Sequence, residues 1–190
     1  MRHGRLLTIM RCSAKTTYLV AAILFVFLSV SAQPKPGEER ITIELPSTYR
    51  WKSKKIPKDT KGIRGTLYAA AGKDTEAVPV DSVTITTIDK RYYPVKAEGI
   101  PEEKLAYIRI ACSDATLEIV NSKTVPGRTA ILYVIKGTNG AGGCGSSTLL
   151  TYVAEGPTAL HTIELHIPAE QYSQEVFKLW CDILLGAKIA

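Results

Sequence analysis

The chain has 190 residues and a formal net charge of +6, which comes from 24 Lys and Arg against 18 Asp and Glu. Four of the basic residues and none of the acids lie within residues 1–32, so the other 20 basic residues exceed the acids by only two. This near balance argues against a nucleic-acid partner. The 158 residues after position 32 are enough for one domain to bury most of its apolar surface without disulfide bonds.

The first 32 residues have the layout of a cleavable secretory signal peptide. Arg and Lys without acids come first, an apolar run over residues 18–30 follows, and the small residues Ser31 and Ala32 close the segment. A permanent membrane anchor is the alternative, but thirteen helical residues span only roughly 20 Å of a hydrocarbon core that is roughly 30 Å thick. We therefore expect an exported protein, periplasmic or extracellular, with no transmembrane segment after cleavage.

Residues 33–40 contain two prolines, a glycine and four charges, which predicts a flexible lead-in to one domain over residues 41–190. Ile41, Ile43 and Leu45 alternate with polar residues before Pro46 and predict a short, half-buried strand. Two further strands are predicted over residues 63–68 and 82–88, which are rich in β-branched residues.

Residues 50–64 carry seven basic side chains and a single acid, and they include Lys52, Lys54, Lys55 and Lys58. We expect a solvated basic loop here. The alternative is a binding segment that meets an anionic membrane face, an acidic glycan or an acidic partner protein. Trp51, at the start of the segment, could be either a core anchor or an interfacial residue.

Residues 101–111 fit two elements. Pro101 followed by Glu102 and Glu103 favours the first turn of a helix, with Leu105 and Ile108 on one stripe. The alternation of apolar residues from position 106 onward would also suit a strand. We take the helix as the prediction.

The second half of the domain predicts four consecutive strands, over residues 116–121, 129–136, 147–154 and 160–167, with no helix between them. Such strands form an antiparallel meander. Residues 171–185 then show apolar side chains at helical spacing, and Gly186 is placed to end the helix. The predicted fold class is α+β, with a central antiparallel sheet, a packed amphipathic C-terminal helix and one further helix.

The segment 137–147 is rich in glycine but does not resemble a phosphate-binding loop. No Lys follows its last glycine, and strands rather than a helix flank it. We expect a long, mobile hairpin loop. A binding loop whose backbone amides at Gly140, Gly142 and Gly143 meet a partner is the alternative.

If the four strands alternate in direction, Cys112, the glycine-rich loop and His166 share one edge of the sheet. Cys112 with Cys144 is then the favoured disulfide pair in an exported protein. Another pairing and three free thiols remain alternatives. Cys181 should lie higher in the C-terminal helix, as a buried free thiol.

The best catalytic constellation is Cys144 as nucleophile with His166 as base, and Glu164 lies on the same strand face as His166. No cysteine-hydrolase signature surrounds these residues, so this enzyme is the alternative rather than the main prediction. No metal site and no cofactor are predicted, because His161 and His166 point to opposite faces of a strand. A half-site from Glu164 and His166 is the remaining metal alternative.

The order of elements resembles the PsbP-like fold family, which includes exported bacterial proteins of the DcrB type. The resemblance is carried by three segments, at residues 46–51, 125–130 and 163–168, the last of which leads into the terminal helix. It implies a non-catalytic binding or accessory protein of a membrane-associated assembly and transfers no site residue. The expected partner is an unknown envelope protein or an anionic surface. An inhibitor or immunity-type protein that neutralises a secreted partner through the glycine-rich loop is a further alternative.

Overall fold

The computed structural model describes residues 38–57, 60–70, 82–126, 128–140 and 143–190, and the side chains of residues 138–146 lie outside that description. All of these residues belong to the unit Gly37–Ala190. The predicted signal peptide, residues 33–37 and Lys58 lie outside the described residues. The elements are β1 (Ile41–Thr42), β2 (Trp51–Ile56), β3 (Ile63–Ala70), β4 (Ser82–Asp89), α2 (Ile100–Arg109), β5 (Thr116–Val125), β6 (Arg128–Gly140), β7 (Gly143–Glu155), β8 (Ala159–Pro168), α3 (Gln174–Leu185) and β9 (Lys188–Ile189), with 3-10 turns at Ala97–Gly99 and Ala169–Gln171.

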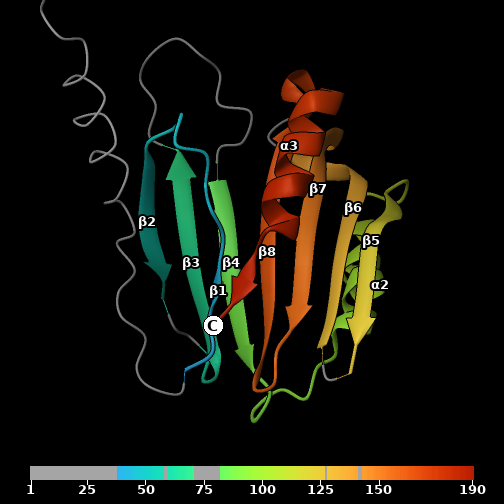
Figure 1. The fold of residues 1–190 in the computed structure, drawn as a ribbon. Helices are drawn as coiled ribbons and strands as arrows, with labels where there is room; N and C mark the ends of the chain where they lie inside the picture. Colours follow the sequence, from blue (N-terminus) through green and yellow to red (C-terminus); the bar gives the residue numbers. More distant parts are fainter. Residues whose placement is uncertain (1–37, 58–59, 71–81, 127, 141–142) are drawn as a thin grey trace, which may run out of the picture. The chain divides into compact units, whose positions relative to one another are not determined.

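Within the described residues, seven strands form one antiparallel sheet in the order β2-β3-β4-β8-β7-β6-β5 (Figure 1). Two meanders, β2 to β4 and β5 to β8, are joined where β4 pairs with β8. The short strands β1 and β9 pair separately and bring the start of the domain to its C-terminus. The α+β class and the antiparallel meander of the second half are confirmed.

Each face of the sheet is covered by one helix. On one face α3 packs Trp180 and Leu184 against alternate residues of the central strands, such as Leu150 and Leu165. The other face is covered by α2 (Figure 1). Its Leu105 belongs to a second apolar cluster. Because successive residues of a strand point to opposite faces, long strands with apolar residues at both parities supply both cores.

The sequence signals for the two helices are confirmed. Pro101 occupies the first turn of α2, and Glu102 and Glu103 follow it. The terminal helix begins later than predicted because the Ser173 hydroxyl oxygen accepts the Val176 amide proton at 3.1 Å and caps it. Trp51 is a core anchor, since its ring meets that of Trp180 edge to face with centroids 6.2 Å apart.

Two predicted loops are wrong. The basic segment does not form a loop over its whole length, because Trp51–Ile56 is a strand paired with β3. The glycine-rich segment is not a long loop either, because β6 continues to Gly140 and β7 starts at Gly143, which pairs with Gly140. In both segments backbone hydrogen bonds to a neighbouring strand outweigh a composition that is poor in strand formers.

Candidate functional site

The basic segment lies at one edge of the sheet. β2 pairs with β3 on one side and has no strand on its other side among the described residues. Lys52, Lys54 and Lys55 are all exposed, and none of them has an ion pair within the described part of the chain. Lys52 and Lys54 point to one face, opposite to Lys55, as strand alternation requires. The edge therefore presents cations on both sides of an open row of backbone groups.

The glycine-rich hairpin lies at the end of the sheet where β6 and β7 meet. Its pairing register shifts twice, between Lys136 and Thr138 and between Thr138 and Gly140. Gly137 has a φ of 82°, a conformation that favours glycine, and its Cα faces the backbone of Ala115. Of the predicted contact residues, Gly140 and Gly143 are brought together as a strand pair, and Gly142 lies outside the described residues.

Cys112 is buried at the same end of the sheet, just after α2, and packs in the core under that helix. Cys181 is a free, buried thiol on α3, as predicted. Burial raises the pKa of Cys181 to about 11, and the nearby Asp182 adds to the effect. The side chain of Cys144 lies outside the described residues.

The proposed catalytic pair is not brought side by side by the strand register. His166 on β8 pairs with Leu149 on β7, and Cys144 lies five residues before Leu149 along the chain. Glu164 is engaged by Lys104, whose Nζ lies 2.8 and 3.1 Å from its two carboxylate oxygens. Desolvation by neighbouring groups lowers the pKa of His166, although the residue is exposed at the surface, and Glu164 partly opposes this effect. The carboxylate is thus committed to a lysine of α2.

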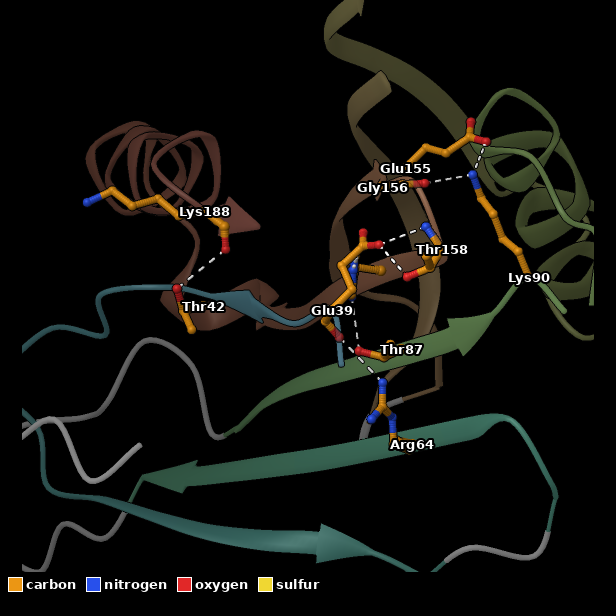
Figure 2. A network of polar contacts seen from close by, with 10 residues as sticks. Glu39, Thr42, Arg64, Thr87, Lys90, Glu155, Gly156, Thr158 and Lys188 are labelled. Carbon is orange, nitrogen blue, oxygen red and sulfur yellow. Dashed lines mark hydrogen bonds and ion pairs between the residues drawn. The ribbon is translucent and has the colours of Figure 1, made fainter. Parts of the chain in front are cut away.

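A polar network that the sequence did not indicate lies at the opposite end of the sheet, around Glu39 (Figure 2). Glu39 Oε2 accepts hydrogen bonds from the Thr158 amide at 2.8 Å and from the Thr158 hydroxyl at 2.6 Å. Its Oε1 lies 3.2 Å from Nε2 of His161, whose side chain is fully buried. The other ring nitrogen, Nδ1, lies 3.0 Å from Thr87 Oγ1. A chain of carboxylate, imidazole and hydroxyl therefore ties residue 39 to β8 and β4.

The same contacts set the protonation states of the network. Burial lowers the pKa of His161, although Glu39 partly offsets the effect. Burial alone would raise the pKa of Glu39, but hydrogen bonds from Thr158 and His161 outweigh it and hold this pKa below its usual value. An ionised Glu39 can only accept, so the Nε2–H of neutral His161 donates a hydrogen bond to it, and Nδ1 accepts one from the Thr87 hydroxyl.

The turn between β7 and β8 is shaped around this carboxylate. A side chain at Gly156 would collide with Glu39, so only glycine leaves room for it. Lys90 braces the turn from β4, because its Nζ lies 2.5 Å from Glu155 and donates to the Gly156 carbonyl at 2.8 Å (Figure 2). Lys90, directly after β4, thus holds the turn in addition to Glu39.

A hollow of about 600 Å³ opens beside Glu39. Its wall carries both signs of charge and includes Glu38, Glu39, Asp89, Lys61, Arg64 and Arg91. Arg64 forms an ion pair with Glu38, and its Nη2 donates to the Glu39 carbonyl at 3.4 Å (Figure 2). The hollow is therefore lined by polar groups that the chain itself has largely paired.

The described residues contain no cluster of three or more His, Cys, Asp and Glu side chains that could hold a metal ion. None of their helices is long and apolar enough to cross a membrane.

No family model matches the chain, and no curated protein matches it. Among solved structures it is similar to the solution structure of cyanobacterial PsbP (CyanoP) from Synechocystis sp. PCC 6803, with 10% sequence identity and a TM-score of 0.50. The match covers 85% of this chain and 99% of that one. At this identity the likeness concerns the fold alone, and the functional residues must be argued from this chain. The fold of the chain is PsbP-like, as the sequence resemblance predicted.

Proposed function

We propose that the chain is an exported, non-catalytic accessory protein of the cell envelope that binds an anionic partner through the cationic edge of β2. The observation that carries the proposal is the row of exposed lysines without ion pairs, Lys52, Lys54 and Lys55, at an open strand edge. Lys96, Lys123 and Lys178 are also exposed without an ion pair among the described residues, but they lie apart from one another, before the 3-10 turn at Ala97–Gly99, on β5 and on α3. On β2 three such lysines lie within four residues, so their charges act together on an anion.

Charged edge strands also prevent sheets from pairing with one another, which would explain lysines at β2 without any ligand. The two explanations differ in what they require of the lysines. Blocking self-association needs only one or two charges at the edge. Binding to an anionic surface depends on the combined charge of several lysines, and the affinity falls as salt screens these charges.

The test compares two variants that lose the same charge. Lys52→Gln/Lys54→Gln/Lys55→Gln removes the β2 row, and Lys96→Gln/Lys123→Gln/Lys178→Gln removes three exposed lysines from elsewhere. We expect the mature protein to sediment with phosphatidylglycerol vesicles at low salt and to be released at high salt. The β2 variant should bind at least about tenfold more weakly, since three charges near an anionic surface are worth about 1 kcal/mol each. Equal loss in both variants, or no binding by the parent, contradicts the proposal.

The export part of the proposal rests on the arrangement of residues 1–32 and predicts a mature N-terminus at Gln33. Intact-mass measurement of the exported protein checks it. A mass that retains residues 1–32 would contradict export with cleavage.

We further propose a disulfide between Cys112 and Cys144. Cys112 is buried and is not free, whereas Cys181 is the free thiol of the described residues. Cys112 also lies at the end of the sheet from which the glycine-rich hairpin extends, since the backbone of Ala115 meets Gly137. Closing a loop of about thirty residues stabilises the fold by roughly 3 to 4 kcal/mol in the chain-entropy model. A contact role for Gly140, Gly142 and Gly143 stays a prediction.

A further inference from the structure

Glu39 is held as a ligand is held in a binding site. Its carboxylate accepts three hydrogen bonds, all from residues that are distant in the chain: the amide and hydroxyl of Thr158 and the ring of His161. His161 is fully buried and fixed on its other side by Thr87. A buried donor of this kind has no water to replace a lost acceptor, and a carboxylate can accept from all three donors at once, so the cradle fits an anionic oxygen best.

The turn that forms the cradle is also held by contacts that do not involve residue 39. It closes with the Gly156 amide donating to the Ala159 carbonyl at 2.9 Å. Lys90 holds the Gly156 carbonyl from the neighbouring strand. Glycine at position 156 keeps open the volume that the carboxylate fills. The donors are therefore preorganised, and removal of Glu39 would leave an anion site rather than a collapsed turn.

Glu38 places a second carboxylate on the same wall. It pairs with Arg64 from β3 and with Arg40, whose Nη2 lies 3.1 Å from Glu38 Oε2. Without these two acids, the charged residues named above for the hollow would be Lys61, Arg64 and the Arg91–Asp89 ion pair, which leaves Lys61 and Arg64 as the cations for a ligand. The wall then has the charge and the donors to receive two neighbouring carboxylates.

Within the described residues, the segment that carries the two acids continues into a short strand pair and into Ile41, Ile43 and Leu45, which pack against the core. Residues 40–42 pair with the last three residues of the chain, through two hydrogen bonds between Arg40 and Ala190 and the two-residue strands β1 and β9. Ile41 is buried, but Thr42 is exposed. A segment whose backbone is held by a two-residue strand pair can open locally while the seven-stranded sheet stays folded, at a cost below that of global unfolding.

We infer that the hollow beside the β7–β8 turn is a binding site for an acidic peptide segment with two adjacent carboxylates, and that Glu38 and Glu39 occupy it as a tethered ligand. Thr158 and His161 bind one carboxylate and Arg64 binds the other. A partner's acidic segment gains access when residues 38–39 leave. This inference concerns the end of the sheet around Glu39 and stands independently of the role proposed for β2.

The test uses the blocked dipeptide N-acetyl-Glu-Glu-amide as the probe and N-acetyl-Gln-Gln-amide as its uncharged match. The variant Glu38→Ala/Glu39→Ala opens the site, and NMR follows the amide of Thr158 and the ring of His161 during titration. We expect saturable binding of the acidic dipeptide by this variant and none of the amide dipeptide. The parent should bind at least about tenfold more weakly, because tethered groups compete at effective concentrations in the millimolar range.

Adding Arg64→Gln to the open variant should abolish dipeptide binding, whereas adding Lys123→Gln, on β5 at the other edge of the sheet, should leave it unchanged. Should the double variant fail to fold, Glu39→Ala alone with acetate as the probe tests the Thr158 and His161 half of the site. Equal binding by parent and open variant, binding that ignores Arg64, or no saturable binding by a folded open variant overturns the inference.

Discussion

Removing the Glu39 carboxylate is the sharpest perturbation of the network at the β7–β8 turn. In Glu39→Ala the Thr158 amide and hydroxyl lie near the surface and regain water. The ring of His161 is fully buried and does not. A hydrogen bond to a charged group contributes about 1.5 to 3 kcal/mol, and a buried donor left without an acceptor costs a similar amount. We therefore expect Glu39→Ala to lower the free energy of unfolding by about 2 to 3 kcal/mol.

Two companion variants separate this account from a general effect of charge. In Glu39→Gln the amide oxygen still accepts from Thr158, and its NH₂ group suits the other tautomer of His161, so we expect less than half of the loss. Glu44→Ala removes a carboxylate of which 94% is exposed and which lies 3.6 Å from Lys188. Its expected cost is below about 0.5 kcal/mol. Urea unfolding at pH 7.5 measures all three, and a Glu39→Ala loss no greater than that of Glu44→Ala would refute the reasoning.

Three further predictions follow from burial and protonation. Burial lowers the pKa of His161, and hydrogen bonds lower the pKa of Glu39. The pKa of His166 is lowered as well. At all three groups the folded state therefore takes up protons less readily than the unfolded chain. The free energy of unfolding should therefore be greatest above pH about 6.5. It should fall as the pH drops below the usual pKa of histidine, and fall again below that of glutamate. A urea midpoint that is the same or higher at pH 5.5 than at pH 7.5 contradicts this. Trp180→Ala should lower the free energy of unfolding by about 3 to 5 kcal/mol, because its ring is fully buried and packs against Trp51. Leu179→Ala, at the adjacent exposed position, should lower it by less than about 1 kcal/mol. Similar losses for both variants in thermal unfolding would refute the core assignment. Thiol titration of the denatured, unreduced mature protein should find Cys181 alone, and Cys144→Ser should lower stability by up to roughly 3 to 4 kcal/mol; three titratable thiols would contradict the proposed disulfide.

The central strands could be predicted from the sequence because their side chains report burial directly. In β8, for example, Ile163, Leu165 and Ile167 alternate with Thr162, Glu164 and His166, and the two sets lie on opposite faces. The amphipathic spacing of α3 is an equally local signal. Such elements are predictable since one face of each is buried whatever its partner is.

The missed strand residues are those whose side chains are not buried. β2 reads Trp-Lys-Ser-Lys-Lys-Ile and shows five exposed positions, because only its backbone joins the sheet. The exposed end of β5, including Lys123 and Val125, and the glycines at the ends of β6 and β7 are added to their strands in the same way. Hydrogen bonds of the backbone carry no residue signature, so composition alone indicated loops there.

The network at Glu39 could not be predicted because it joins residues 122 positions apart. Glu38–Arg40 lies in the segment expected to be a flexible lead-in, and its charges gave no sign of burial. His161 was noticed only as one of two histidines on opposite faces, and this placement is confirmed. A buried histidine on a strand needs a partner, but which carboxylate supplies it depends on the β1–β9 pairing at the end of the chain.

The proposed function is tested most directly by finding which backbone amides of the sheet an anionic surface protects from hydrogen exchange. Hydrogen exchange of the mature protein, with and without phosphatidylglycerol vesicles at low salt, measures this at each amide. We expect added protection along Trp51–Ile56, whose outer backbone groups have no strand partner among the described residues. Protection that instead falls on α2 around its exposed Tyr107 and Ile110, or that leaves β2 unchanged, would contradict binding through the cationic edge.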